Sequence, residues 1–129
     1  ASAHSTRGHP MDQHRDALRA GGVPDARTLN QLPDGHRLTY VGMVICRQRP
    51  GTASGVTFFT MEDETGLVNV VVWRRVFERR RLIGKTAKVL GVRGKLQVAE
   101  GVTHLVADDL FVPELEEESE VTLLSRDFH

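Results

Sequence analysis

The sequence lacks several features that define particular classes of protein. Its single cysteine, Cys46, excludes an internal disulfide and a zinc site built from several cysteines. It has no apolar run near the roughly 20 residues that cross a bilayer, and its first residues lack the apolar stretch of a signal peptide. These absences predict a soluble, cytoplasmic protein. Cys46 itself is expected to be a small residue of the core.

Metal ligands in a useful pattern are also missing. The spacing of His4, His9 and His14 fits neither neighbours on one helix face nor a zinc finger, so they are expected to be solvent-exposed. The acidic triplet 62–64 lies in an expected hairpin, with no further ligands held at fixed geometry nearby. We therefore predict no metal, no cofactor and no catalytic residue in this chain.

Net charge is absent, although charge is unevenly distributed. Seventeen basic residues balance seventeen acidic ones. The segment 74–88 nevertheless holds seven basic residues and one acid, whereas 108–120 holds seven acids and no base. A local basic patch can bind phosphate whatever the net charge, because screening limits charge interactions to about 8–10 Å. The acidic tail either folds back over the basic segment and competes with phosphate, or stays solvated.

The N-terminal region is expected to be helical. Residues 12–20 read as a short helix that ends at a glycine pair, and 26–32 as a second helical turn before a Pro-Asp-Gly turn. We interpret residues 1–36 as a helical linker segment from a preceding domain.

The pattern then becomes that of an all-β domain. Strands are predicted at 38–47, 56–62 and 67–73, then a short helix at 76–83, then strands at 87–98 and 102–112. Gly42 indicates a bulge or sharp bend in the first strand. Three strands, a helix and two strands are the layout of the five-stranded OB-fold barrel. An open sheet is the alternative, but closure removes exposed edges. We place the barrel at 37–113 and an acidic C-terminal tail at 114–129.

Strand alternation sorts side chains between the core and the surface. Phe59, Met61 and Cys46 are predicted to point inward, and Arg47, Phe58 and Trp73 outward. Bases stack on exposed aromatic rings and arginines hold the backbone of a single strand. The predicted nucleic-acid-binding residues are Arg47, Arg49, Thr52, Phe58, Thr60, Asn69, Trp73, Arg74 and Arg75. For the two aromatic residues the alternative is packing against a helix or the N-terminal segment, and for the arginines a merely solvated surface.

Six segments carry a resemblance to a known family. They are Gly8–Met11 (GHPM), Arg47–Ala53 (RQRPGTA), Glu62–Gly66 (EDETG), Asn69–Trp73 (NVVVW), Val76–Arg79 (VFER) and the terminal Ser125–His129 (SRDFH). Together they resemble the C-terminal OB domain of bacterial error-prone C-family DNA polymerases, the damage-inducible second DNA polymerase III alpha subunit. The EDETG hairpin alone is less specific, because synthetase anticodon-binding domains share it.

The resemblance implies a parent enzyme that copies DNA past lesions, with its catalytic carboxylates outside this chain. It also implies work alongside the sliding clamp and a Y-family-like accessory protein. On this basis the chain is predicted to bind single-stranded template DNA. The alternative is a protein-docking OB domain that recruits an accessory subunit of the mutagenic polymerase complex.

Overall fold

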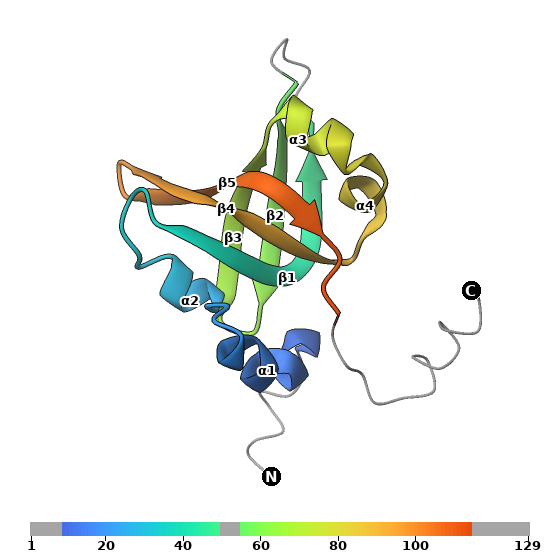
Figure 1. Cartoon of the computed structure of the whole chain (residues 1–129). Coiled ribbons are helices and arrows are strands. Elements are labelled where there is room, and N and C mark those ends of the chain that lie inside the picture. Colours follow the sequence, from blue (N-terminus) through green and yellow to red (C-terminus); the bar gives the residue numbers. More distant parts are fainter. Residues whose placement is uncertain (1–8, 50–54, 115–129) are drawn as a thin grey trace, which may run out of the picture.

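A computed structural model describes residues 9–49 and 55–114, and its centre is a closed five-stranded barrel (Figure 1). The strands are β1 (Arg37–Gln48), β2 (Thr57–Asp63), β3 (Gly66–Val72), β4 (Val89–Ala99) and β5 (Val102–Phe111). Their order around the barrel is β1-β2-β3-β5-β4, with β1 pairing with β4 to close it. Only the β3–β5 pair among these is parallel. The predicted OB-fold is confirmed.

The long first strand belongs to both halves of the barrel. Its first residues pair with β4 and its last with β2, and the change takes place at Met43. The neighbouring Gly42 is required sterically, because a Cβ there would lie 2.7 Å from the Tyr40 hydroxyl oxygen. Gly42 therefore marks the bend, as expected. The bulge lies further along, between Val44 and Cys46.

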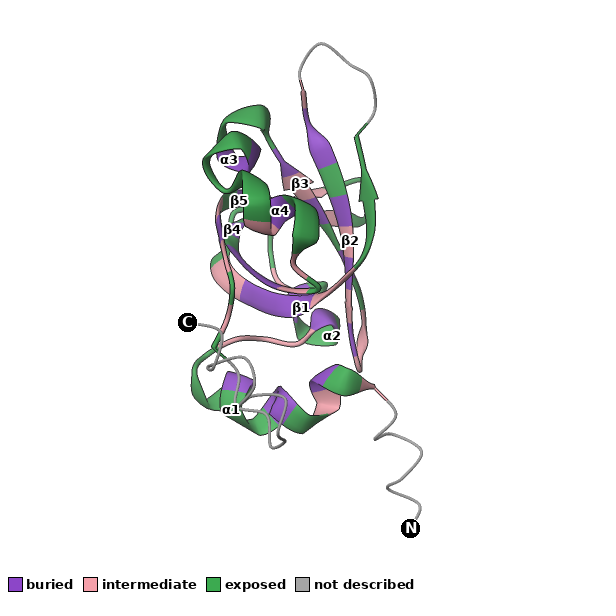
Figure 2. Ribbon diagram, turned by 90° about the vertical axis from the view of Figure 1, so that its right-hand side faces the viewer, coloured by how far each residue is buried: buried purple, intermediate pink, exposed green. Residues whose placement is uncertain are grey.

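All five strands contribute buried residues to the barrel core (Figure 2). Burial in β2 and β3 follows the two-residue repeat of a strand with one face in the core. The largest fully buried side chains of the barrel are Tyr40, Phe59, Met61, Leu90, Leu96, Leu105 and Leu110.

The connection from β3 to β4 is helical, as predicted, but consists of two helices. α3 (Arg74–Arg79) and α4 (Arg81–Thr86) meet at Arg80, whose φ of −119° and ψ of 44° leave the helical region. Val76 and Phe77 of α3 enter the barrel core, and the Phe77 ring meets Phe59 edge-on with centroids 6.4 Å apart. The single helix expected at 76–83 therefore turns after its first half.

The N-terminal segment packs against the barrel (Figure 1). It comprises the 3-10 helix η2 (Pro10–His14) and the helices α1 (Arg15–Ala20) and α2 (Ala26–Leu29). Ala26 and Leu29 belong to the barrel core, while Met11 and Leu18 form a second cluster with Val41. Apolar burial of this kind is the main stabilising contribution in a small domain. Residues 9–36, which were expected to be a linker, thus pack onto the barrel and contribute to its core.

One buried carboxylate joins this segment to the barrel. Oδ2 of Asp63 accepts hydrogen bonds from the Ala26 backbone N–H (2.8 Å), the Tyr40 hydroxyl (3.0 Å) and the Arg15 guanidinium (3.3 Å). Oδ1 accepts from the Thr65 backbone and hydroxyl, at 2.7 and 2.8 Å, and closes the β2–β3 turn. Burial, together with the adjacent Asp63 carboxylate, raises the pKa of Tyr40 far above its usual range. Asp63 is a structural hub.

The histidines of the segment differ from expectation. His14 is buried, and the His9 ring accepts a hydrogen bond from the Met11 backbone N–H while its other nitrogen lies 3.2 Å from a Glu62 carboxylate oxygen. The prediction of solvent-exposed histidines is wrong at these two positions, because η2 folds onto β2. His4 lies outside the described residues. Over 9–49 and 55–114, no cluster of three potential metal-ligating side chains occurs.

None of the helices within the described ranges is long and apolar enough to span a membrane.

Candidate nucleic-acid interface

The outward side chains of β1, β2 and β3 form one continuous surface, called here the outer face. Residues that lie directly opposite one another on neighbouring antiparallel strands point to the same side of the sheet. Such residues form rows across the strands. Thr60 lies between Cys46 and Asn69 in one row, and Phe58 lies between Gln48 and Val71 in the next. The outer face comprises Cys46, Gln48, Phe58, Thr60, Asn69 and Val71.

Phe58 on the outer face and Trp73 directly after β3 are exposed aromatic residues. The exposed fraction is 37% for Phe58 and 48% for Trp73, whereas it is 1% for Phe59. The outward direction of Phe58 follows from the unbroken alternation of β2. Trp73 directly follows β3 and precedes α3, where its extended backbone (φ −72°, ψ 157°) starts the helix. Rings with this exposure can stack on bases.

The sequence-based assignment fails in the second half of β1. The extra residue of the bulge shifts the alternation, so that Cys46 lies opposite outward Thr60 and Arg47 opposite inward Phe59. Cys46 is exposed, which contradicts the expectation of a core cysteine. Arg47 lies in the row of inward Phe59 rather than on the outer face, which contradicts its expected direction, although the residue itself remains exposed. A bulge that carries no proline or glycine of its own leaves little signal in a sequence.

Arg47 is held by the protein itself. Its Nε donates to the Gly84 carbonyl (2.7 Å) and an Nη donates to the Ala87 carbonyl (2.6 Å), while its guanidinium carbon lies 5.5 Å from the Phe59 ring centroid. Burial lowers the pKa of the Arg47 guanidinium. These bonds satisfy carbonyl groups at the end of α4, which otherwise lack intrahelical partners. Arg47 therefore ties α4 to β1, and we leave it out of the contact set proposed below.

The other predicted arginines lie near one end of β2. Arg49 is exposed, with its guanidinium carbon 5.0 Å from the Phe77 ring centroid. Arg74 is exposed and lies close to Gly55, where a Cβ would be 3.1 Å from its Nε. Arg75 is exposed on α3. Thr52, between Arg49 and Gly55 in the sequence, lies outside the described residues, as does the acidic tail beyond Glu114.

Two arginines in the middle of the basic run, the segment 74–88, contact β5. Arg79 donates to the Asp108 carbonyl (2.7 Å), and Arg80 donates to the Asp109 carboxylate (2.9 Å). The hydrogen bond from Arg80 lowers the pKa of Asp109. These two arginines hold α3 and the start of α4 against the barrel, so only part of the run can serve as a phosphate-binding patch.

The structure also adds residues that sequence reasoning missed. The parallel β3–β5 pair sets His104 beside Asn69 and Val106 beside Val71, and β4 continues these rows with Gln97 and Lys95. The alternation within β5 could have identified His104 as outward-facing. Its place beside Asn69 depends on the β3–β5 pairing, which no local pattern encodes.

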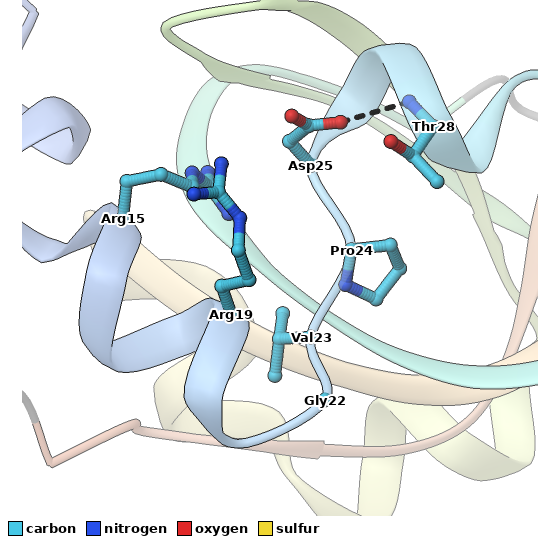
Figure 3. Close-up of a pocket in the computed structure, with 7 residues that line it drawn as sticks. All are labelled: Arg15, Arg19, Gly22, Val23, Pro24, Asp25 and Thr28. Carbon is cyan, nitrogen blue, oxygen red and sulfur yellow. Dashed lines mark hydrogen bonds between the residues drawn. The ribbon is translucent and has the colours of Figure 1, made fainter.

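A separate pocket of about 260 Å³ lies between α1 and α2 (Figure 3). Arg15 and Arg19 reach into it from α1, opposite Asp25 and Thr28. Arg15 also binds Asp63 and Glu64. With Asp25, three carboxylates outnumber the two guanidinium groups, which disfavours phosphate in this pocket. None of its lining residues belongs to the outer face.

Comparison with known proteins agrees with this geometry. A family model described as an OB-fold nucleic-acid-binding domain, of the tRNA anticodon type, matches residues 39–113. This chain belongs to that OB-fold family. A solved asparaginyl-tRNA synthetase from Pyrococcus horikoshii, bound to asparaginyl-adenylate, has the same fold. The TM-score is 0.60 at 22% identity, covering 75% of this chain and 23% of the synthetase.

The resemblance to error-prone DNA polymerases is confirmed. This OB domain is 47% identical over 104 residues to the error-prone DNA polymerase of Caulobacter vibrioides. The matched region covers 81% of this chain and 10% of the polymerase. It is 43% identical over 124 residues to that of a Bradyrhizobium species, covering 95% of this chain and 10% of the polymerase. The chain thus spans about one-tenth of the relatives it matches.

Proposed function

We propose that this OB domain is the single-stranded-DNA-binding module of an error-prone translesion DNA polymerase. One observation carries the proposal: Phe58 and Trp73 are exposed, and Phe58 lies in the outer face beside Thr60 and Asn69. Stacking supplies affinity that tolerates any base sequence, at about 1–3 kcal/mol per base. The polar side chains can meet base edges or sugars. Arg49, Arg74 and Arg75 are the proposed phosphate contacts, and Thr52 completes the proposed set.

The wider setting is part of the same proposal. Nucleotidyl transfer would be performed by other parts of a cytoplasmic polymerase that takes part in SOS mutagenesis and DNA repair. This chain would supply no catalytic residue and would guide the template strand. The sliding clamp and a Y-family-like accessory protein are proposed partners of the whole polymerase.

A second function shares the surface. Ile45 precedes Cys46 on β1 and Leu67 lies two residues before Asn69 on β3, and both are about half exposed, at 48% and 50%. Exposed apolar side chains that cluster with aromatic residues also suit a protein interface. Docking of an accessory subunit is therefore the alternative, and it predicts little or no DNA binding by the isolated chain.

Titration of the chain with single-stranded DNA at two salt concentrations separates the two functions. We expect a dissociation constant in the micromolar range or weaker, with little sequence preference, because one aromatic pair is a small platform. Affinity should fall as salt rises, because bound phosphates release counterions. Duplex DNA of the same sequence is the control. Tighter binding to the duplex, or no binding to the single strand at low salt, would contradict the proposal.

A further inference from the structure

His104 extends the polar row of the outer face onto β5. It lies opposite Asn69 on one side and opposite Gln97 on the other, and Asn69 in turn lies opposite Thr60. Strands are about 4.8 Å apart, so Thr60, Asn69 and His104 cover about 10 Å of this row. The His104 side chain is partly exposed. A strand of DNA that lies across β2 and β3 therefore reaches His104 without leaving the row.

The surroundings of His104 contain few charges. From β3, the outward residues nearest to it are Leu67, Asn69 and Val71, none of which titrates. From β4, the outward residues nearest to it are Gln97 and Lys95, of which only Lys95 carries charge. A proton taken up by His104 would thus add positive charge beside a lysine, on a surface proposed to face phosphates.

The remaining charges on its strand lie further along and have partners. Asp108 binds Arg37 at 2.8 Å, and Asp109 binds Arg80. The end of α3 and the junction between α3 and α4 reach β5 at these positions, through Arg79 and Arg80. Asp108 is four residues beyond His104, about 13 Å along the strand. These carboxylates are too distant to take the place of a phosphate at His104.

We propose that His104 contacts the bound strand and that its protonation strengthens single-stranded DNA binding. This inference rests on the proposed function. Histidine is the side chain whose charge ordinarily changes between pH 5 and 8, and the protonated ring donates from both nitrogens. A charged donor binds a phosphate oxygen more strongly than a neutral one does. Binding therefore gains one phosphate contact as the pH falls.

The test uses a thymidine oligonucleotide, because thymine does not titrate between about pH 5.8 and 8.0, where histidine does. For the unaltered chain, we expect affinity about fivefold higher at the lower pH, the difference between a charged and a neutral hydrogen bond. The slope of log affinity against log salt should steepen by about 0.7, the value for one phosphate on a single strand. His104→Gln should bind equally at both pH values, and His104→Lys should bind tightly at both.

His36→Gln is the matched control. His36 is exposed, and its backbone carbonyl accepts a hydrogen bond from Leu96 of β4, so it lies at the other edge of β4 from β5. This variant should keep the full pH dependence, and thermal melts at both pH values confirm that each variant is folded. If His104→Gln keeps the pH dependence while DNA still binds, the inference on His104 is wrong and the proposed function stands. If the unaltered chain does not bind at either pH, the proposed function itself is wrong.

Discussion

Phe58 and Phe59 are consecutive residues of β2 whose rings lie on opposite sides of the barrel wall. Phe59 is buried and packs edge-on against Phe77, whereas Phe58 is exposed between Gln48 and Val71. The same substitution at these two positions should therefore have two separate effects, one on binding and one on stability.

For Phe59→Ala we expect a loss of about 3–5 kcal/mol in the free energy of unfolding, because it leaves a cavity in a small core. Phe58→Ala should change stability little and should weaken single-stranded DNA binding by about 1–3 kcal/mol, the value of one stacked base. Urea denaturation and DNA titration of both variants measure these effects. The assignment of the two sides is inverted if Phe58→Ala is the variant that unfolds.

The Asp63 hub should be essential for stability. Asp63→Ala leaves the buried Arg15 guanidinium with fewer acceptors and the Tyr40 hydroxyl and Ala26 N–H without their bonds. Removing one partner of a buried pair costs about 3–5 kcal/mol. Asp16→Ala, at a fully exposed carboxylate 3.9 Å from Arg19, is the control and should leave the free energy of unfolding almost unchanged. Equal free energies of unfolding for the two variants would show that the hydrogen bonds of Asp63 do not stabilise the fold.

Arg47 and Arg74 should differ in the salt dependence of DNA binding. Arg74→Ala removes a proposed phosphate contact, so the slope of log affinity against log salt should become shallower by about 0.7. Arg47→Ala should lower the thermal stability, because the Gly84 and Ala87 carbonyls lose their donors, and should leave the slope unchanged. If the slope of log affinity against log salt also becomes shallower for Arg47→Ala, Arg47 contacts phosphate as well.

The Arg80–Asp109 pair predicts a pH dependence of stability. Its hydrogen bond lowers the pKa of Asp109 in the folded chain, so the pair stabilises the fold above the ordinary aspartate pKa of about 3.9. This contribution is lost as the pH falls through the lowered pKa and Asp109 takes up a proton. Arg80→Gln should melt slightly below the unaltered chain near pH 7 and level with it near pH 2. Arg19→Gln, at an exposed pair, should melt at the same temperature as the unaltered chain at both pH values. A lower melting temperature of Arg80→Gln that persists near pH 2 would contradict the assignment.

The sequence predicted most of the fold because its β2–β3 hairpin is regular. From Thr57 to Val72, buried and exposed side chains alternate on both sides of the turn, so the directions of Phe58, Phe59 and Asn69 follow from counting. The same counting places Asp63 on the inward side with Phe59 and Met61, a signal of its burial that the acidic triplet obscured. In β1 the counting fails after the bulge, which reverses Cys46 and Arg47.

Other parts of the site could not be predicted locally. His104 comes beside Asn69 only because β5 pairs in parallel with β3, across more than thirty intervening residues. The packing of α1 against the barrel depends on Arg15 reaching Asp63 and Glu64, far along the chain. Such contacts depend on the complete topology, and no propensity of a single segment encodes them.

Alkylation of Cys46 tests most directly whether DNA binds at the outer face. Cys46 is the only cysteine of the chain, is exposed, and lies opposite Thr60, about 7–8 Å diagonally from Phe58. The rate of its reaction with a maleimide can be measured with saturating single-stranded DNA, without DNA, and with the Phe58→Ala variant as control. We predict that the single strand slows the reaction severalfold, and that at the same DNA concentration it protects Phe58→Ala less. An unchanged rate on a chain shown to be saturated with single-stranded DNA would place the DNA elsewhere and contradict the account.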